Sequence, residues 1–232
     1  MTLLERVVKT IKNNEVHIKS DNPLAKSHFD NFRNYADYII NQFNHNLYSN
    51  YLKGENLVIL DIGANIGLFS LHANDCASII YSFEPTPQHF QLLKEFTKDY
   101  NNIKPINIAI SDKDSDIDFY LCDDNTTMNS IINKYGKSIT VKGRSIISFL
   151  NENNINKVDF IKCDIEGSEM IALKEECIKP LFNIVDKWFI EVHPTENQSQ
   201  EYNLNLLIRN FTSIGYSCDK IDKETIFVYK TK

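Results

Sequence analysis

Four side chains that could transfer a proton or bind a metal follow two apolar runs of the sequence, and they are Asp164, Glu166, Glu191 and His193. Within each pair the spacing of two residues places both members on the same side of an extended strand. If the two strands are neighbours, the pairs converge. Carboxylates with one imidazole can accept a proton, or they can bind Mg²⁺ or Mn²⁺. The sequence therefore predicts a chemical centre here and leaves both alternatives open.

A glycine turn upstream has the pattern of a cofactor site. The segment VILDIGANIGLFS, residues 58–70, is an apolar run followed by Gly63 and Gly67 on either side of Asn65, and then a return to apolar residues. This pattern predicts a buried strand, a tight turn and the start of a helix. Glycine allows positive φ and lets the backbone approach a ligand closely.

Polar residues also follow the next two predicted strands. Glu84 follows the strand at residues 78–83, where a carboxylate commonly holds the ribose of an adenosine-type cofactor. Ser111 and Asp112 follow a third strand at residues 105–110. Ligands of open parallel sheets lie beyond this carboxyl edge, so Ser111 and Asp112 are candidates for the adenine pocket.

The elements that must position these residues alternate between strand and helix. Thr86 and Pro87 predict a helix start. Residues 113–145 form an excursion with two short strands, and Ser145 or Ser148 opens the next helix. Further strands are predicted at residues 158–163 and 188–190, and the runs at residues 216–221 and 225–229 predict an antiparallel hairpin.

Residues 1–54 are predicted to form a helical extension to one domain spanning residues 55–232. Residues 3–12 have amphipathic helical spacing, and the aromatic stretch at residues 29–52 also has broadly helical spacing. Two interpretations remain open for the aromatic stretch. It packs as a cap against the sheet, or some of its side chains line the mouth of a substrate cleft.

Composition excludes several classes of protein. The 232 residues include 25 basic and 31 acidic side chains, a net charge of −6, and the basic residues are scattered, which argues against a nucleic-acid partner. Five widely spaced cysteines without a C-x-x-C pair indicate reduced thiols. No apolar run reaches membrane-spanning length. We expect a soluble, cytoplasmic protein without a membrane partner; its oligomeric state is left open.

Four motifs together resemble the FkbM family of S-adenosylmethionine-dependent methyltransferases: D-I-G-A-N-I-G from Asp61, F-E-P from Phe83, D-F-I-K-C-D-I-E-G-S-E from Asp159 and E-V-H-P from Glu191. Their order and spacing match over roughly residues 55–195. The resemblance implies an α/β, Rossmann-like class I fold with a seven-stranded, mostly parallel sheet and an antiparallel C-terminal strand. It also implies S-adenosylmethionine as methyl donor and O-methylation of a hydroxyl group.

The resemblance further implies roles for individual residues. The methionine part of the cofactor would be held by Asp61, Gly63, Asn65 and Gly67. Glu84 would hold the ribose, Ser111 and Asp112 the adenine edge, and Asp164 would lie near the sulfonium. The expected acceptor is a sugar, nucleotide-linked or belonging to a capsule or surface polysaccharide.

An alcohol is a poor nucleophile at neutral pH, so a positioned base is useful. We expect His193 to be this base, because its intrinsic pKa is the most suitable. Asp164, Glu166 and Glu191 would orient it or replace it. The alternative is that the four residues bind Mg²⁺ or Mn²⁺, which would lower the pKa of the acceptor hydroxyl.

Other functions compete with this hypothesis. The acceptor could be a non-sugar secondary metabolite, or the chain could bind cofactor or sugar without catalysis. A nicotinamide dehydrogenase is disfavoured, because Asn65 stands where the G-x-G-x-x-G pattern requires its second glycine.

Overall fold

A computed structural model describes residues 48–121, 129–132 and 137–231. The helices predicted within residues 1–47 lie outside the described residues. Of the extension predicted at residues 1–54, only the part from residue 48 is described, and it contains a short 3₁₀ turn at Tyr48–Asn50. Among the described residues, no helix is long and apolar enough to cross a membrane.

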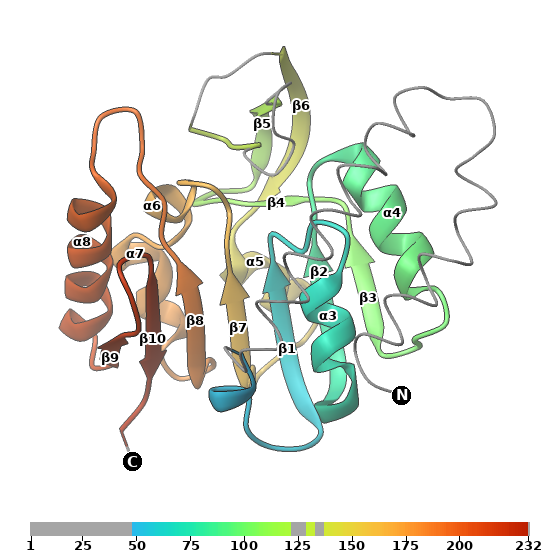
Figure 1. Cartoon of the computed structure of the whole chain (residues 1–232), viewed down its shortest axis with the longest axis horizontal. Coiled ribbons are helices and arrows are strands. Elements are labelled where there is room, and N and C mark those ends of the chain that lie inside the picture. The colour runs from blue at the N-terminus through green and yellow to red at the C-terminus, as the bar shows by residue number, and fades with distance from the viewer. Residues whose placement is uncertain (1–47, 122–128, 133–136, 232) are drawn as a thin grey trace.

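A seven-stranded sheet with the order β3-β2-β1-β7-β8-β10-β9 forms the centre of the molecule (Figure 1). Its strands are β1 (Leu57–Ile62), β2 (Ala77–Phe83), β3 (Ile103–Ile106), β7 (Phe160–Cys163), β8 (Lys187–Glu191), β9 (Ser217–Lys220) and β10 (Thr225–Tyr229). β3, β2, β1, β7 and β8 are parallel, and β10 is antiparallel to both β8 and β9. This is the predicted class I methyltransferase sheet with its reversed last strand, so the fold prediction is confirmed.

Helices cover both faces of this sheet, and a few short helical turns connect them. The elements are α3 (Leu68–Ala73), η2 (Asn74–Cys76), α4 (Pro87–Thr97), α5 (Ile146–Glu152), α6 (Glu169–Ala172), α7 (Glu175–Ile178), η4 (Lys179–Leu181) and α8 (Gln200–Ser213). Side chains of α5, α7 and α8 join one apolar cluster with the sheet, whereas α3 and α4 join a second cluster. The result is a three-layered α/β/α arrangement.

Strand alternation explains why there are two clusters. In β7, Phe160 packs in the cluster with α3 and α4, whereas Ile161 and Cys163 pack in the other. Lys162 follows the same alternation as Phe160. A strand buried on both faces normally has a continuous apolar sequence, so a lysine within β7 is unusual.

A second, three-stranded sheet differs from the prediction. The single strand predicted at residues 105–110 is in fact two strands, because β3 ends at Ile106 and β4 (Ala109–Ile110) pairs with β6 (Lys137–Arg144). β5 (Ser115–Leu121) pairs antiparallel with β6. In Figure 1 this small sheet lies beyond the end at which β1 and β7 finish.

No element is predicted above for residues 195–215, yet α8 occupies most of them. Its N-cap Ser199 accepts a hydrogen bond from the amide of Tyr202. Leu204, Leu207 and Phe211 give it a buried face. The predicted cap at Ser145 is confirmed, since its hydroxyl accepts from the Ser148 amide at 3.2 Å.

Candidate active site

The glycine turn after β1 lies against the loop after β7. Gly63 has φ 77°, and a Cβ there would lie 1.8 Å from the carbonyl oxygen of Asp164. The turn is fixed from the other side, because the amides of Gly63 and Ala64 both donate to the carbonyl of Phe83. Only glycine allows the two loops to approach so closely.

Two other residues of this segment lie beneath the cleft surface and stabilise the packing around the turn. Asp61 is fully buried and accepts a hydrogen bond from Ser70 Oγ at 2.5 Å, which ties β1 to α3. A Cβ on Gly67 would meet Leu93 Cδ1 at 2.6 Å, so this glycine allows α4 to pack closely. Neither residue lines the cleft, whereas Gly63 and Asn65 do.

Glu84 lies at the end of β2, as predicted, and lines the cleft. One carboxylate oxygen accepts from the amide of Asn65 at 2.9 Å and the other from the amide of Thr86 at 2.8 Å. Burial raises the pKa of Glu84 to about 7, although its hydrogen bonds to Thr86 and Asn65 oppose this change. The carboxylate thus joins the glycine turn to the start of α4.

A cleft of about 920 Å³ lies above these strand ends. Its walls come from the glycine turn, from Glu84 to Thr86, from Ile108 to Ile110 and from the loop Asp164–Ser168, and the small sheet adds Phe119 together with Asn129 and Ile131.

The segment Asn129–Ile132, which we call the strap, connects two sides of the cleft. Asn129 Nδ2 donates to Thr86 Oγ1 at 3.3 Å on one side. On the other side Ser130 Oγ donates to the Glu166 carbonyl at 2.8 Å, and the Ile131 amide donates to Ser168 Oγ at 3.1 Å. Sequence reasoning placed this segment in the excursion at residues 113–145 and did not predict its contribution to the cleft.

Ser111 and Asp112, the predicted adenine contacts, do not line the cleft. Asp112 instead forms an ion pair with Lys174 at 2.8 Å, and Ser111 is buried. The split between β3 and β4 explains the difference, because the chain leaves the main sheet after Ile106 and presents Ile108, Ala109 and Ile110 to the cleft.

Lys162 is a cleft residue that sequence reasoning missed. Its Nζ donates to the Gly63 carbonyl at 2.9 Å and lies 3.2 Å from Asp164 Oδ2 and 3.8 Å from Asp61 Oδ1. The side chain is almost fully buried. A lysine within an apolar strand, two residues before Asp164, was the signal that could have revealed it, because buried lysines are rare unless paired.

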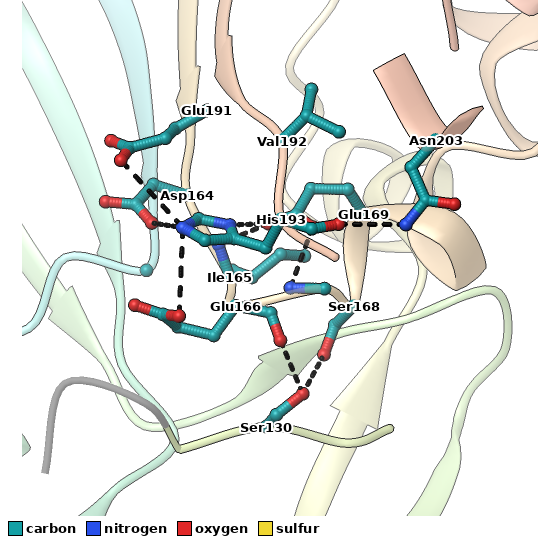
Figure 2. A network of polar contacts seen from close by, with 12 residues as sticks. Ser130, Asp164, Ile165, Glu166, Ser168, Glu169, Glu191, Val192, His193 and Asn203 are labelled. Carbon is teal, nitrogen blue, oxygen red and sulfur yellow. Dashed lines mark hydrogen bonds and ion pairs between the residues drawn. The ribbon is translucent and has the colours of Figure 1, made fainter. Parts of the chain in front are cut away.

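The two strand-end pairs converge, as the two-residue spacing predicted, because β7 and β8 are parallel neighbours. His193 Nε2 lies 3.8 Å from Asp164 Oδ1, 3.7 Å from Glu166 Oε2 and 3.9 Å from Glu191 Oε1. Figure 2 shows the ring with these three carboxylates around one of its nitrogens. Asp164 and Glu166 also line the cleft.

Glu169 binds the other nitrogen of the ring. Its Oε1 lies 3.2 Å from His193 Nδ1 and also accepts from the amide of Ile165, while Oε2 accepts from the amide of Gly167. Glu169 is fully buried, and it was not among the predicted site residues. It fixes both the ring and the loop that carries Asp164 and Glu166.

The carboxylates change the protonation of the cluster. Burial lowers the pKa of His193, but the hydrogen bond to Glu169 and the charges of Glu169, Asp164 and Glu166 outweigh burial and raise this pKa to about 10. Burial raises the pKa of Glu166 to about 8, although the charge of His193 opposes this change. The intrinsic pKa of a free histidine, on which the predicted role as base depended, therefore does not describe this ring.

A sequence model of the methyltransferase FkbM domain matches residues 61–218. The chain belongs to this family. The match begins near the end of β1 and includes the glycine turn, β7, β8 and the four residues of the cluster, and it confirms the family that the motifs predicted.

One curated protein and several solved structures are similar to this chain. The hexuronic acid methyltransferase AglP of Haloferax volcanii is 28% identical over 123 residues, which are 52% of this chain and 50% of that protein. The match thus spans about half the length of that relative. The Methanococcus jannaschii fibrillarin pre-rRNA processing protein has a TM-score of 0.47 and 15% identity, covering 77% of this chain and 69% of its own. Aeropyrum pernix fibrillarin, in complex with natively bound S-adenosyl-L-methionine, has a TM-score of 0.44 and 14% identity, covering 77% and 67%.

Proposed function

We propose that this chain is an S-adenosylmethionine-dependent O-methyltransferase that acts on a hydroxyl of a sugar. Membership of the methyltransferase FkbM domain family supports methyl transfer. The partial similarity to a hexuronic acid methyltransferase supports a sugar acceptor. The observation that carries the proposal is the placement of Asp164 and Glu166, which line the cleft and also belong to the carboxylate and imidazole cluster.

The cleft residues fit a nucleoside cofactor. Gly63 and Asn65 present backbone at the turn, and Glu84 presents a buried carboxylate that can accept hydrogen bonds from ribose hydroxyls. Ile108, Ala109 and Phe119 offer an apolar wall suited to a base. When bound, S-adenosylmethionine supplies a methyl group on a positively charged sulfur. We assign the adenine contact to this wall instead of Ser111 and Asp112.

The cluster then has the task of positioning the acceptor and receiving its proton. Bound S-adenosylmethionine would supply the methyl group to the acceptor oxygen, and the electron pair of the broken carbon–sulfur bond would remain on sulfur. A hydroxyl proton is released, and the Asp164 carboxylate at the cleft wall is placed to take it. Alignment of oxygen, carbon and sulfur accounts for much of the rate, because the displacement is in line.

The test is a mass-shift screen of the full chain with S-adenosylmethionine and a panel of sugars. The panel contains nucleotide-linked sugars, which are our preferred acceptors as precursors of capsule or surface polysaccharides, their free glycosides, and non-sugar alcohols. We expect one sugar class to gain one methyl group while S-adenosylhomocysteine forms in equal amount. A gain confined to non-sugar alcohols would overturn the sugar assignment.

Calorimetry separates catalysis from binding alone. We expect S-adenosylhomocysteine to bind and NAD not to bind. Tight binding of NAD alone would contradict the proposal. Binding of S-adenosylhomocysteine without methylation of any member of the panel would instead favour a non-catalytic binding protein.

A further inference from the structure

We propose that Asp164, Glu166 and His193 bind a divalent cation, Mn²⁺ or Mg²⁺, beside the cofactor cleft. The separations of the donor atoms are the first observation. His193 Nε2 lies 3.7 Å from Glu166 Oε2 and 3.8 Å from Asp164 Oδ1, and both separations are too long for hydrogen bonds. The three donors nevertheless lie within 4.8 Å of one another.

These separations fit a single metal ion bound between the side chains. Metal–oxygen bonds of about 2.1 Å place neighbouring donors about 3 Å apart and opposite donors about 4.2 Å apart. The observed separations of 3.7 and 3.8 Å lie between these two values. Shifts of less than an ångström in side chains would therefore complete the coordination.

The contact that holds the histidine ring is the second observation, and it involves a residue other than the three donors. Glu169 is fully buried and is held by the amides of Ile165 and Gly167, both at 2.8 Å. Its Oε1 lies 3.2 Å from His193 Nδ1, and because a carboxylate oxygen accepts, Nδ1 donates in this hydrogen bond. A divalent cation would displace the proton of the other nitrogen, Nε2, which is the atom that faces the carboxylates (Figure 2). A carboxylate behind a histidine is the usual support of a metal ligand.

The loop backbone gives a third indication. Glu166 has φ 54°, in the left-handed region that non-glycine residues rarely adopt. This conformation occurs in the turn before Gly167, and the Glu166 and Asp164 carboxylates both face His193 Nε2 (Figure 2). A divalent cation would add positive charge among these carboxylates, and Glu191, 3.9 Å from Nε2, would remain beside it as a further carboxylate.

The donor atoms indicate which cation binds. The role of that cation in catalysis rests on the proposed function. Two carboxylates favour Mg²⁺ or Mn²⁺, and the imidazole favours Mn²⁺ of these two. Because Asp164 and Glu166 line the cleft, the cation would be close enough to hold an acceptor hydroxyl and to lower its pKa.

The test is a titration of the full chain with Mn²⁺, followed by the electron paramagnetic resonance signal of the free ion. We expect one bound Mn²⁺ per chain, displaced by excess Mg²⁺. Glu166→Gln and His193→Ala should each weaken binding at least about tenfold. Glu55→Gln is the matched control, because Glu55 is exposed and precedes β1, at the opposite end of the parallel strands from the cluster, and its Mn²⁺ affinity should equal that of the wild type.

Circular dichroism and thermal unfolding without metal show whether each variant is folded. Glu166→Gln is the decisive variant, because it keeps the backbone carbonyl that accepts from Ser130 Oγ at 2.8 Å. No Mn²⁺ binding to the folded wild type, or equal binding by wild type and Glu166→Gln, would overturn the cation site. Methylation that persists in EDTA with no bound Mn²⁺ would contradict the role of the cation in the reaction and leave the proposed function intact. Binding of Mn²⁺ without methylation of any acceptor would support the cation site and contradict the proposed function.

Discussion

At the level of single residues, Gly63 joins the cofactor turn to the loop that carries Asp164. Substitution by alanine meets two obstacles there, a φ of 77° and a backbone oxygen 1.8 Å from the new Cβ. We expect Gly63→Ala to lower the free energy of unfolding by more than the approximately 1–2 kcal/mol of a left-handed alanine, and to weaken S-adenosylhomocysteine binding. Chemical denaturation and calorimetry measure the two effects.

Gly215→Ala is the matched control for that substitution. Gly215 also has a positive φ, 104°, but a Cβ there meets only the Phe182 ring, at 3.2 Å, and Gly215 does not line the cleft. Its variant should lose stability and retain cofactor affinity. Equal cofactor affinity in the two variants would contradict the role assigned to the loop contact.

Glu84 should make stability depend on pH. Burial raises its pKa in the folded protein to about 7, above the usual value of 4.5. The folded state therefore binds this proton more tightly than the unfolded state does, and its contribution is full below about pH 4.5 and is lost as pH rises through about 7. At about 1.4 kcal/mol per pKa unit the loss is about 3 kcal/mol at most.

Denaturant unfolding of the wild type and of Glu84→Gln between pH 5 and pH 8 measures this contribution. The variant removes the carboxyl group, so it should show a shallower fall in the free energy of unfolding over this interval. Parallel pH curves for the two proteins would show that the Glu84 pKa is not raised.

The residues of the chemical cluster could be predicted, but their support could not. The two-residue spacing at the ends of two neighbouring parallel strands was enough to predict that His193 and Asp164 lie close together. Lys162 contributes through the Gly63 carbonyl and Glu169 through the His193 ring, and both partners are distant in sequence. Residue spacing carries no information on such contacts, so the buried partners of the cluster emerged only from the structure.

At the level of elements, the strap connects the small sheet to both walls of the cleft. Ser168 Oγ accepts from the Ile131 amide and lies 3.3 Å from Ser130 Oγ. We expect Ser168→Ala to weaken S-adenosylhomocysteine binding about fivefold, the equivalent of about 1 kcal/mol for a lost hydrogen bond. Calorimetry provides the measurement.

Ser213→Ala is the control for the strap. The Ser213 hydroxyl donates to the Asn210 carbonyl at the exposed end of α8, so its removal tests the loss of a hydroxyl far from the cleft. Its cofactor affinity should equal that of the wild type. If both serine variants bind S-adenosylhomocysteine as the wild type does, the strap does not shape the cofactor site.

Element boundaries were predictable where local signals agreed with tertiary contacts. The starts of α4 and α5 follow from Thr86, Pro87 and Ser145. The split between β3 and β4 was not predictable, because residues 103–110 read locally as one apolar strand. Only pairing with β6, which lies far along the chain, assigns Ala109 and Ile110 to a different sheet.

At the level of the whole molecule, β10 supports the strand that carries Glu191. Ile226 of β10 is fully buried and opposite Ile190 of β8. We expect Ile226→Ala to lower the free energy of unfolding by about 2–5 kcal/mol, the usual cost of such a cavity. At a temperature where the variant remains folded, its S-adenosylhomocysteine affinity should be unchanged, because the cofactor turn follows β1.

Thermal unfolding and calorimetry on the same sample measure both properties. A loss of cofactor affinity in proportion to the loss of stability would show that the cofactor turn depends on the packing of β10. That outcome would contradict the independence of the two regions.

The topology of the main sheet was predictable because a family resemblance supplied the strand order, and the glycine turn located its first strand. The helical extension at residues 1–54 remains a prediction. The cleft itself was not predictable in detail, since part of its wall comes from Phe119 and Ile131, which belong to an excursion without a recognised motif.

The position of β10 between β8 and β9 also determines the order in which the protein can fold during synthesis. Until β10 has been made, β8 has an unpaired edge, and Glu191 and His193 are at the end of an edge strand. The nascent chain therefore exposes the unpaired edge of β8, which can pair with other chains, until β10 is inserted. We expect slow release of residues 217–231 from the ribosome to favour aggregation, and chaperones that bind extended apolar segments to act during this interval.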